Sequence, residues 1–173
     1  MNILVPRALV RLWPLALAML LAPSAAQANK VANKLKGKII LSPKAFPSSF
    51  ASDKAFIKHM RRADTKRFTY GESQKIGVEF MAFFARKYTV TEFTVTIFDI
   101  TERREMVTTF PVYPQQRETR ILASFVRLEP DAFQEEHRFL MVVQPTYGGP
   151  VIAETQFAIK AGKRGKKKAP AKP

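Results

Sequence analysis

The chain has 173 residues and carries 29 Lys and Arg against 14 Asp and Glu, so its formal charge is +15 at pH 7. It contains no cysteine, which excludes disulfides, cysteine-ligated zinc, thiol catalysis and lipid attachment through a cysteine. The length suits one ordinary domain, and a hydrophobic content of 46% with 14 Phe predicts a folded core rather than a disordered chain.

The N-terminal segment that ends at Ala28 is typical of a secretory signal peptide. Arg7 and Arg11 form a positive start, residues 14–22 form a short apolar run, and Ala26 and Ala28 fit the small-x-small pattern of a cleavage site. We therefore expect cleavage after Ala28 and export to the periplasm or the outside of a bacterial cell. The alternative is a membrane anchor, which needs about 20 apolar residues. Because the run is shorter than this, no transmembrane span is expected after cleavage.

The remaining chain is expected to divide into three parts. Residues 29–36 are polar and basic, and we expect a flexible lead-in there. The folded domain is expected at residues 37–162. Residues 163–173 contain six basic residues and no large apolar residue, so they cannot bury enough surface to offset the entropy of ordering. We expect a disordered basic tail.

Within the domain, apolar residues recur mostly at every second position, as they do in β-strands. The expected strands are 38–41, 75–84, 92–100, 105–112, 119–128, 137–144 and 151–160. Residues 75–84 are apolar on both faces, which predicts a central strand that is covered on both sides. The turn residues at 145–150, with Gly148 and Gly149, suit a hairpin between the last two strands.

One segment has the period of a helix. Ser52 can cap a helix that begins at Asp53, where a carboxylate suits the helix dipole, and that ends near Asp64. The apolar side of this helix would carry Phe56, Ile57, Met60 and Ala63. The opposite side would carry Lys54, Lys58, Arg61 and Arg62, and the basic run continues through Lys66 and Arg67.

These elements predict a mainly β fold. Short strands with hairpin-length connections and a single helix fit a two-sheet antiparallel β-sandwich of immunoglobulin-like type with one inserted amphipathic helix. The closing hairpin over 137–160 is typical of many such domains and is not specific to one family.

The sequence offers little for catalysis. His59 is expected on the flank of the helix, and His137 at the start of a strand, both as surface residues. We expect no metal site and no cofactor, because no ligand spacing or phosphate-binding loop is present. The alternative to a non-enzymatic protein is a glycan hydrolase that uses carboxylates in two loops. These carboxylates are Asp99, Glu102 and Glu105 in one loop, and Glu129, Asp131, Glu135 and Glu136 in the other.

Binding is the favoured class of function. The candidate polyanion-binding residues are Lys163, Arg164, Lys166, Lys167 and Lys168 in the tail and Lys54, Lys58, Arg61 and Arg62 on the helix. No aromatic residue lies between the tail cations, so sequence-specific binding of nucleic acid is not expected. The sequence therefore predicts an exported interaction module whose partner is a protein or an anionic component of the cell envelope. Its tail would act as an electrostatic tether, or only as a solubilising segment.

Overall fold

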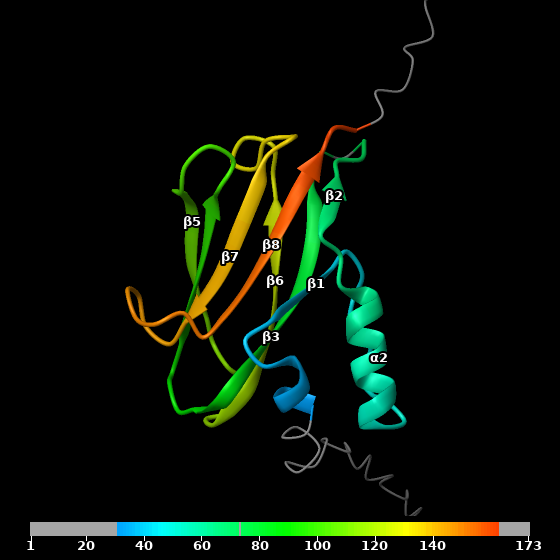
Figure 1. Ribbon diagram of the computed structural model, residues 1–173, viewed down its shortest axis with the longest axis vertical. Coiled ribbons are helices and arrows are strands. Elements are labelled where there is room, and N and C mark those ends of the chain that lie inside the picture. Colours follow the sequence, from blue (N-terminus) through cyan, green and yellow to red (C-terminus); the bar gives the residue numbers. More distant parts are fainter. Residues whose placement is uncertain (1–30, 73, 163–173) are drawn as a thin grey trace, which may run out of the picture.

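The computed structural model describes residues 31–72 and 74–162 (Figure 1). The expected signal peptide at 1–28 and the expected basic tail at 163–173 lie outside the described residues. The strands are β1 (Ile39–Ser42), β2 (Arg67–Thr69), β3 (Ile76–Tyr88), β4 (Phe93–Asp99), β5 (Glu105–Val112), β6 (Thr119–Leu128), β7 (Arg138–Gln144) and β8 (Ala153–Lys160). A single helix of several turns, α2 (Asp53–Ala63), lies between β1 and β2 in the described chain.

The strands form two sheets that share one core. One sheet has three strands in the order β1-β3-β6, and the other has five in the order β2-β8-β7-β4-β5. The core lies between them and contains side chains from both sheets, with Phe80 and Phe84 from β3, Phe93 from β4 and Phe139 from β7 all fully buried. The predicted mainly β, two-sheet fold is confirmed.

The prediction that the strand at 75–84 is central and covered on both sides is also confirmed. β3 pairs antiparallel with β1 on one edge and with β6 on the other. Phe80 faces the core between the sheets, while Phe83 packs in a second cluster on the outer face of the same sheet. β3 extends to Tyr88, further than expected, because Tyr88 regains register with Thr119 after an irregularity.

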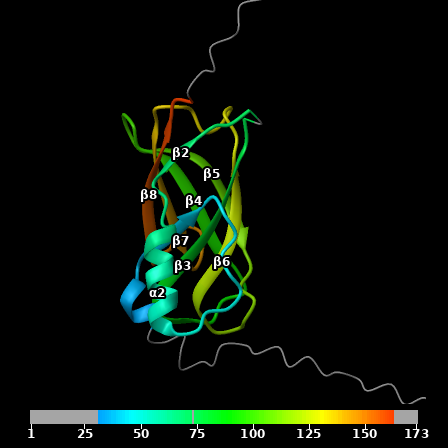
Figure 2. The same ribbon diagram turned by 90° about the vertical axis from the view of Figure 1, so that its right-hand side faces the viewer.

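Helix α2 covers the outer face of the three-stranded sheet (Figure 2). The Ser52 hydroxyl accepts a hydrogen bond of 3.2 Å from the Ala55 amide, which is the predicted N-cap. Ile57 and Met60 are buried against Phe83 of β3, whereas Phe56 is only partly buried. The sequence therefore predicted both the ends and the buried side of this helix.

The N-terminal lead-in differs from expectation. Residues 31–35 form a short helical turn, and Val31, Ala32 and Leu35 on one side of that turn are buried. Val31 and Leu35 join the same outer cluster as Met60. Gly37 ends the turn with a φ of 75°, a conformation that favours glycine. The three apolar residues are spaced for a helix, so this part of the lead-in packs as part of the domain.

The prediction of purely antiparallel sheets is wrong in one place. β2, which the sequence did not predict, pairs in parallel with β8, and Lys38 forms an isolated parallel bridge with Glu154. Lys66 lies at this corner, where its ammonium is 2.8 Å from Asp64 and donates hydrogen bonds to the Ile39 carbonyl and to the Thr155 hydroxyl. The two sheets are thereby joined along the side where β1 and β8 meet.

The last hairpin matches its prediction. β7 and β8 pair antiparallel, and Gly148 in the connecting turn has a φ of 74°. In the part of the chain that the structure describes, no helix has both the length and the apolar character needed to cross a membrane.

Candidate functional site

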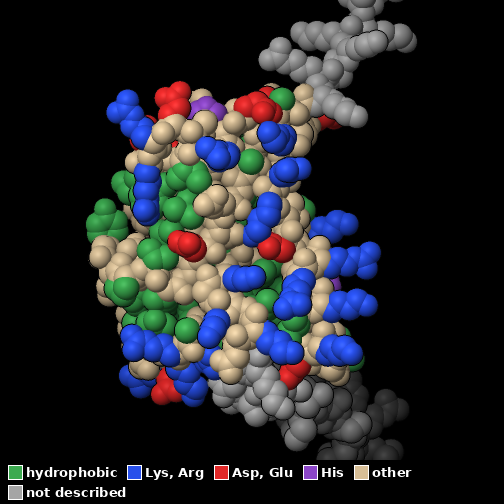
Figure 3. Space-filling model, viewed as in Figure 1, with side chains coloured by type: hydrophobic (Ala, Val, Ile, Leu, Met, Phe, Trp, Pro, Cys, Tyr) green, Lys and Arg blue, Asp and Glu red, His purple; other side chains and the backbone are tan. Residues whose placement is uncertain are grey.

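The predicted basic residues of α2 lie together on its solvent side. Lys54, Lys58, Arg61 and Arg62 are all exposed, because Ile57 and Met60 turn the other side of the helix onto the sheet. We call these four residues the cationic face of α2. Figure 3, drawn in the view of Figure 1, shows Lys and Arg side chains projecting in a column from the side of the molecule where α2 lies.

Within residues 31–72 and 74–162, none of the four side chains of the cationic face has an ion-pair partner. The neighbouring basic residue Lys66 differs, because it forms an ion pair with Asp64 and bonds at the corner of the two sheets. Arg67 is exposed at the start of β2. The structure therefore brings together the predicted helix cations and gives Lys66 a structural role.

The tail cations Lys163, Arg164, Lys166, Lys167 and Lys168 lie outside the described residues. The last described residue, Gly162, donates its amide to Glu135 at 3.0 Å, and the Ala161 amide donates to Glu136 at 2.7 Å. The chain thus leaves the domain at an end rich in carboxylates, not beside the cationic face of α2 (Figures 1 and 3).

That acidic end affects the phenol of Tyr70, which is partly buried. The Tyr70 hydroxyl donates a hydrogen bond of 2.6 Å to the Phe133 carbonyl. Burial raises the pKa of Tyr70 to about 12, and the charges of Asp131, Glu135 and Glu129 add to the shift. Tyr70 is therefore neutral and serves as a hydrogen-bond donor that holds the loop after β6.

Most of the loop carboxylates proposed for glycan hydrolysis have structural partners. Glu129 pairs with Lys75 at 3.0 Å, and Glu105 lies 3.8 Å from Arg103. Glu136 binds the Ala161 amide and Lys160, which lower its pKa. Glu135 holds the Gly162 amide. The contacts of Glu135 and Glu136 thus hold the chain at the end of β8.

One pair of residues was missed by the sequence analysis. Nδ1 of His137, the residue before β7, lies 2.5 Å from Oδ2 of Asp99, at the end of β4. Burial alone would raise the pKa of Asp99, but hydrogen bonds from His137 and Thr101 outweigh it, so the pKa is lowered. The two residues are 38 positions apart in the sequence. Only the register of β4 against β7 brings them together.

We expect the ionisation of Asp99 to make the free energy of unfolding depend on pH under acidic conditions. Because the pKa of Asp99 is lower in the folded chain than its ordinary value of 3.8, ionised Asp99 stabilises the fold above that pH, and the effect is lost as the pH falls through the folded pKa. Asp99→Asn should lower the free energy of unfolding at pH 7 by about 1 kcal/mol. Urea unfolding between pH 7 and pH 2 should show a shallower acid decline in this variant. Glu102→Gln, in the same loop and exposed, is the control, and equal acid declines in Asp99→Asn and the unsubstituted protein would contradict the role of Asp99.

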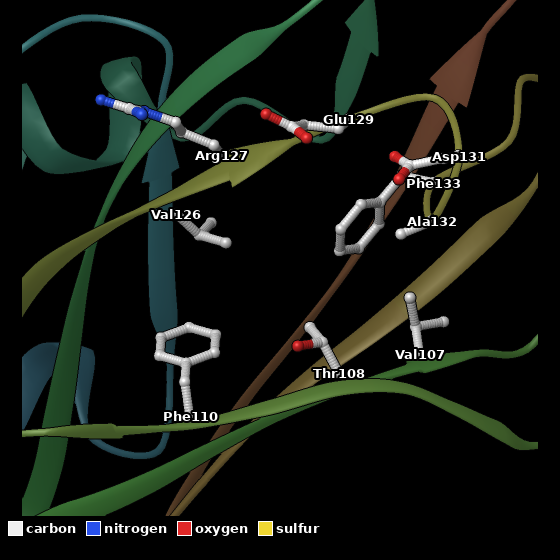
Figure 4. Close-up of a pocket in the computed structure, with 9 residues that line it drawn as sticks. All are labelled: Val107, Thr108, Phe110, Val126, Arg127, Glu129, Asp131, Ala132 and Phe133. Carbon is white, nitrogen blue, oxygen red and sulfur yellow. The ribbon is translucent and has the colours of Figure 1, made fainter.

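The side of the molecule opposite the β1–β8 corner is open. A hollow of about 260 Å³ lies between the edge strands β5 and β6 (Figure 4). Val107, Thr108 and Phe110 enter it from β5 and Val126 from β6, while the loop at 129–133 closes one end. The hollow was not predicted from the sequence, because it depends on which strands lie at the edges of the two sheets.

Among the described residues, no group of three or more His, Asp or Glu side chains is placed to hold a metal ion. A scan of known protein families and a search of curated proteins find no match.

Solved structures similar to part of this chain include two of a β-glucosidase from Listeria innocua. The one in complex with glucose has a TM-score of 0.33 and 18% identity, over 56% of this chain and 15% of that chain. The one in complex with gluconolactone has a TM-score of 0.33 and 15% identity, over 71% of this chain and 16% of that chain. The matched region thus spans about a sixth of the β-glucosidase chain.

Proposed function

We propose that the protein is an exported, non-enzymatic binding module with an immunoglobulin-like topology, and that it docks on an anionic surface of the cell envelope through the cationic face of α2. The export step follows from the signal-like segment that ends at Ala28. The basic tail would add a second, separate cationic contact.

The order of the strands supports the immunoglobulin-like topology. In that fold, strands C, F and G are neighbours in one sheet, and A, B and E are neighbours in the other. Here β4-β7-β8 and β1-β3-β6 have these two orders. The strand between C and E, β5, pairs with β4 rather than with β6, which moves it to the five-stranded sheet.

The cations of α2, which have no ion-pair partner among the described residues, are the observation that carries the binding proposal. Lys54, Lys58 and Arg62 follow one another at intervals of four residues, and like charges at this spacing destabilise a helix by about 0.2–0.5 kcal/mol per pair. Lys54 also lies in the first turn, where the helix dipole disfavours a cation. A bound anion would relieve both effects. A helix selected only for solubility would gain from mixed charges on this face.

Anionic lipid headgroups and phosphorylated glycans offer the same chemistry. A Lys or Arg near an anionic membrane contributes about 1 kcal/mol to binding. Replacing all four residues of the cationic face by Gln should therefore weaken binding to vesicles that contain phosphatidylglycerol by at least about 100-fold. Vesicle co-sedimentation at low salt measures this, and a heparin column tests glycan-like polyanions in parallel.

The matched control replaces four exposed cations elsewhere by Gln, so that the net charge changes equally. These are Arg86, Arg103, Arg117 and Arg138. A comparable loss of binding in the control would show that only net charge matters, and it would contradict a dedicated face. Deletion of 163–173 separates the tail from the helix. If that deletion abolishes binding while the α2 variant binds normally, the proposal for α2 is wrong.

A further inference from the structure

The two sheets differ in width on one side of the molecule. The five-stranded sheet ends in β5, and the three-stranded sheet ends in β6. Both edges border the hollow between the sheets. A fourth strand beside β6 would lie opposite β5, so the three-stranded sheet lacks a strand where the other sheet continues.

The side chains at this position are those of an incomplete core. Val107 and Phe110 of β5 and Val126 of β6 are only partly buried, although they pack against the main core. Figure 4 shows them directed into the hollow from opposite sheets, and the buried ring of Phe133 lies at its closed end. The volume of about 260 Å³ is slightly below the range of about 300–1,000 Å³ of small-molecule pockets. It suits a few side chains of a strand.

Of the sheet edges, that of β6 is the least protected. β5 contains Pro111, and its register with β4 is irregular between Met106 and Thr108; both features discourage further pairing. β1 and β2 meet at the corner that Lys66 joins. β6 has 10 residues, contains no proline, and keeps a regular register with β3 from Leu128 back to Ile121.

We propose that the gap between β5 and β6 accepts an extended peptide segment of a partner protein, which pairs with the free edge of β6 and inserts every second side chain into the hollow. This is strand addition, in which the backbone supplies affinity and alternate side chains supply specificity. The inference does not depend on the proposed function, because the residues of the gap and those of α2 are separate sets.

The charges around β6 define the chemistry of the peptide. Arg127 is exposed near the end of β6, and Asp131 is exposed in the loop that follows. Glu129 is already paired with Lys75. A strand antiparallel to β6 would start beside Asp131, so a basic residue is favoured at its N-terminal end and an acidic residue opposite Arg127. Apolar residues are favoured at the alternate positions that enter the hollow.

A second copy of this chain fits the gap less well than a single strand. If two copies paired through β6, the β5 strands of both copies would lie on the same side of the joined sheet. These two β5 strands would then meet in a space that has room for one strand. A single peptide strand has no second sheet and avoids this clash.

The test uses a fluorescent synthetic peptide of the same length as β6, 10 residues, with the pattern just described. Fluorescence anisotropy measures its affinity for residues 29–173, and ¹H–¹⁵N spectra locate it. We expect chemical-shift changes at the amides of β5 and β6, and slower hydrogen exchange at the amides of β6. A peptide of the same composition without the alternation should bind at least about tenfold more weakly.

Variants of the protein complete the test. Ala132 lines the hollow and is exposed, so Ala132→Trp should fill the hollow without disturbing the core and weaken peptide binding at least about tenfold. Ala51→Trp, at an exposed site before α2, should bind normally, as should the α2 Gln variant. Equal binding of both peptides, normal binding to Ala132→Trp, no binding near 1 mM peptide, or dimerisation of the protein through β6 would each overturn the proposal.

Discussion

Phe80→Ala is expected to lower the free energy of unfolding by about 3–5 kcal/mol, a large part of the stability of a domain of this size. Phe80 lies on the central strand β3, has no exposed surface and packs in the core shared by both sheets. The chain has no cysteine, so no disulfide adds stability that could offset this loss. Urea denaturation followed by far-ultraviolet circular dichroism measures the effect.

Phe125→Ala is the matched control for this substitution. Phe125 lies on β6 directly beside the partner of Phe80, Ser124, but its side chain is 62% exposed. Phe125→Ala should therefore lower the free energy of unfolding by less than about 1 kcal/mol. Equal losses for the two phenylalanines would mean that the core does not lie between the sheets.

Leu35→Ala is expected to lower the free energy of unfolding by about 2–5 kcal/mol. Leu35 belongs to the helical turn at 31–35, is 2% exposed, and packs with Ile40 and Met60 in the outer cluster. A flexible lead-in would show no effect. Thermal and urea unfolding of the variant therefore distinguish a packed turn from a disordered one.

Lys34→Ala controls for the turn itself, because Lys34 is exposed in the same segment. Lys34→Ala should change the free energy of unfolding by no more than about 0.5 kcal/mol. If Leu35→Ala were equally neutral, the packing of residues 31–35 against the sheet would be refuted.

Local sequence signals predicted the elements that depend on local physics. The cap at Ser52 and the spacing of Ile57 and Met60 predicted α2 from its start to its buried side. The alternation of apolar residues on both faces of β3 predicted a central strand. The glycines after Pro145 predicted the last hairpin, because few other residues adopt the positive φ found at Gly148.

Features that depend on distant contacts were not predictable. β2 has three residues, of which only Phe68 is buried, so it shows no period. Its parallel pairing depends on β8, about 90 positions later in the chain. The turn at 31–35 has too few apolar residues to be distinguished from a polar lead-in without the surface on which it packs.

The candidate sites also divide into one that local sequence predicts and others that depend on distant contacts. The exposure of Lys54, Lys58, Arg61 and Arg62 followed from the period of one helix, and the structure brings these residues together. The contact between Asp99 and His137 required the register of β4 and β7. The hollow between β5 and β6 required the order of strands in both sheets. Neither order nor register is encoded in the pattern of a single strand.

The pairing of β2 with β8 also bears on when the chain can fold. Arg67 pairs with Ala158 and Lys38 bridges to Glu154, so the N-terminal part of the domain cannot complete its hydrogen bonds until almost all of the domain has been synthesised. Contacts so distant in sequence slow folding. Such a delay would be compatible with the export that we propose, because most of the domain would still be unfolded when its synthesis ends.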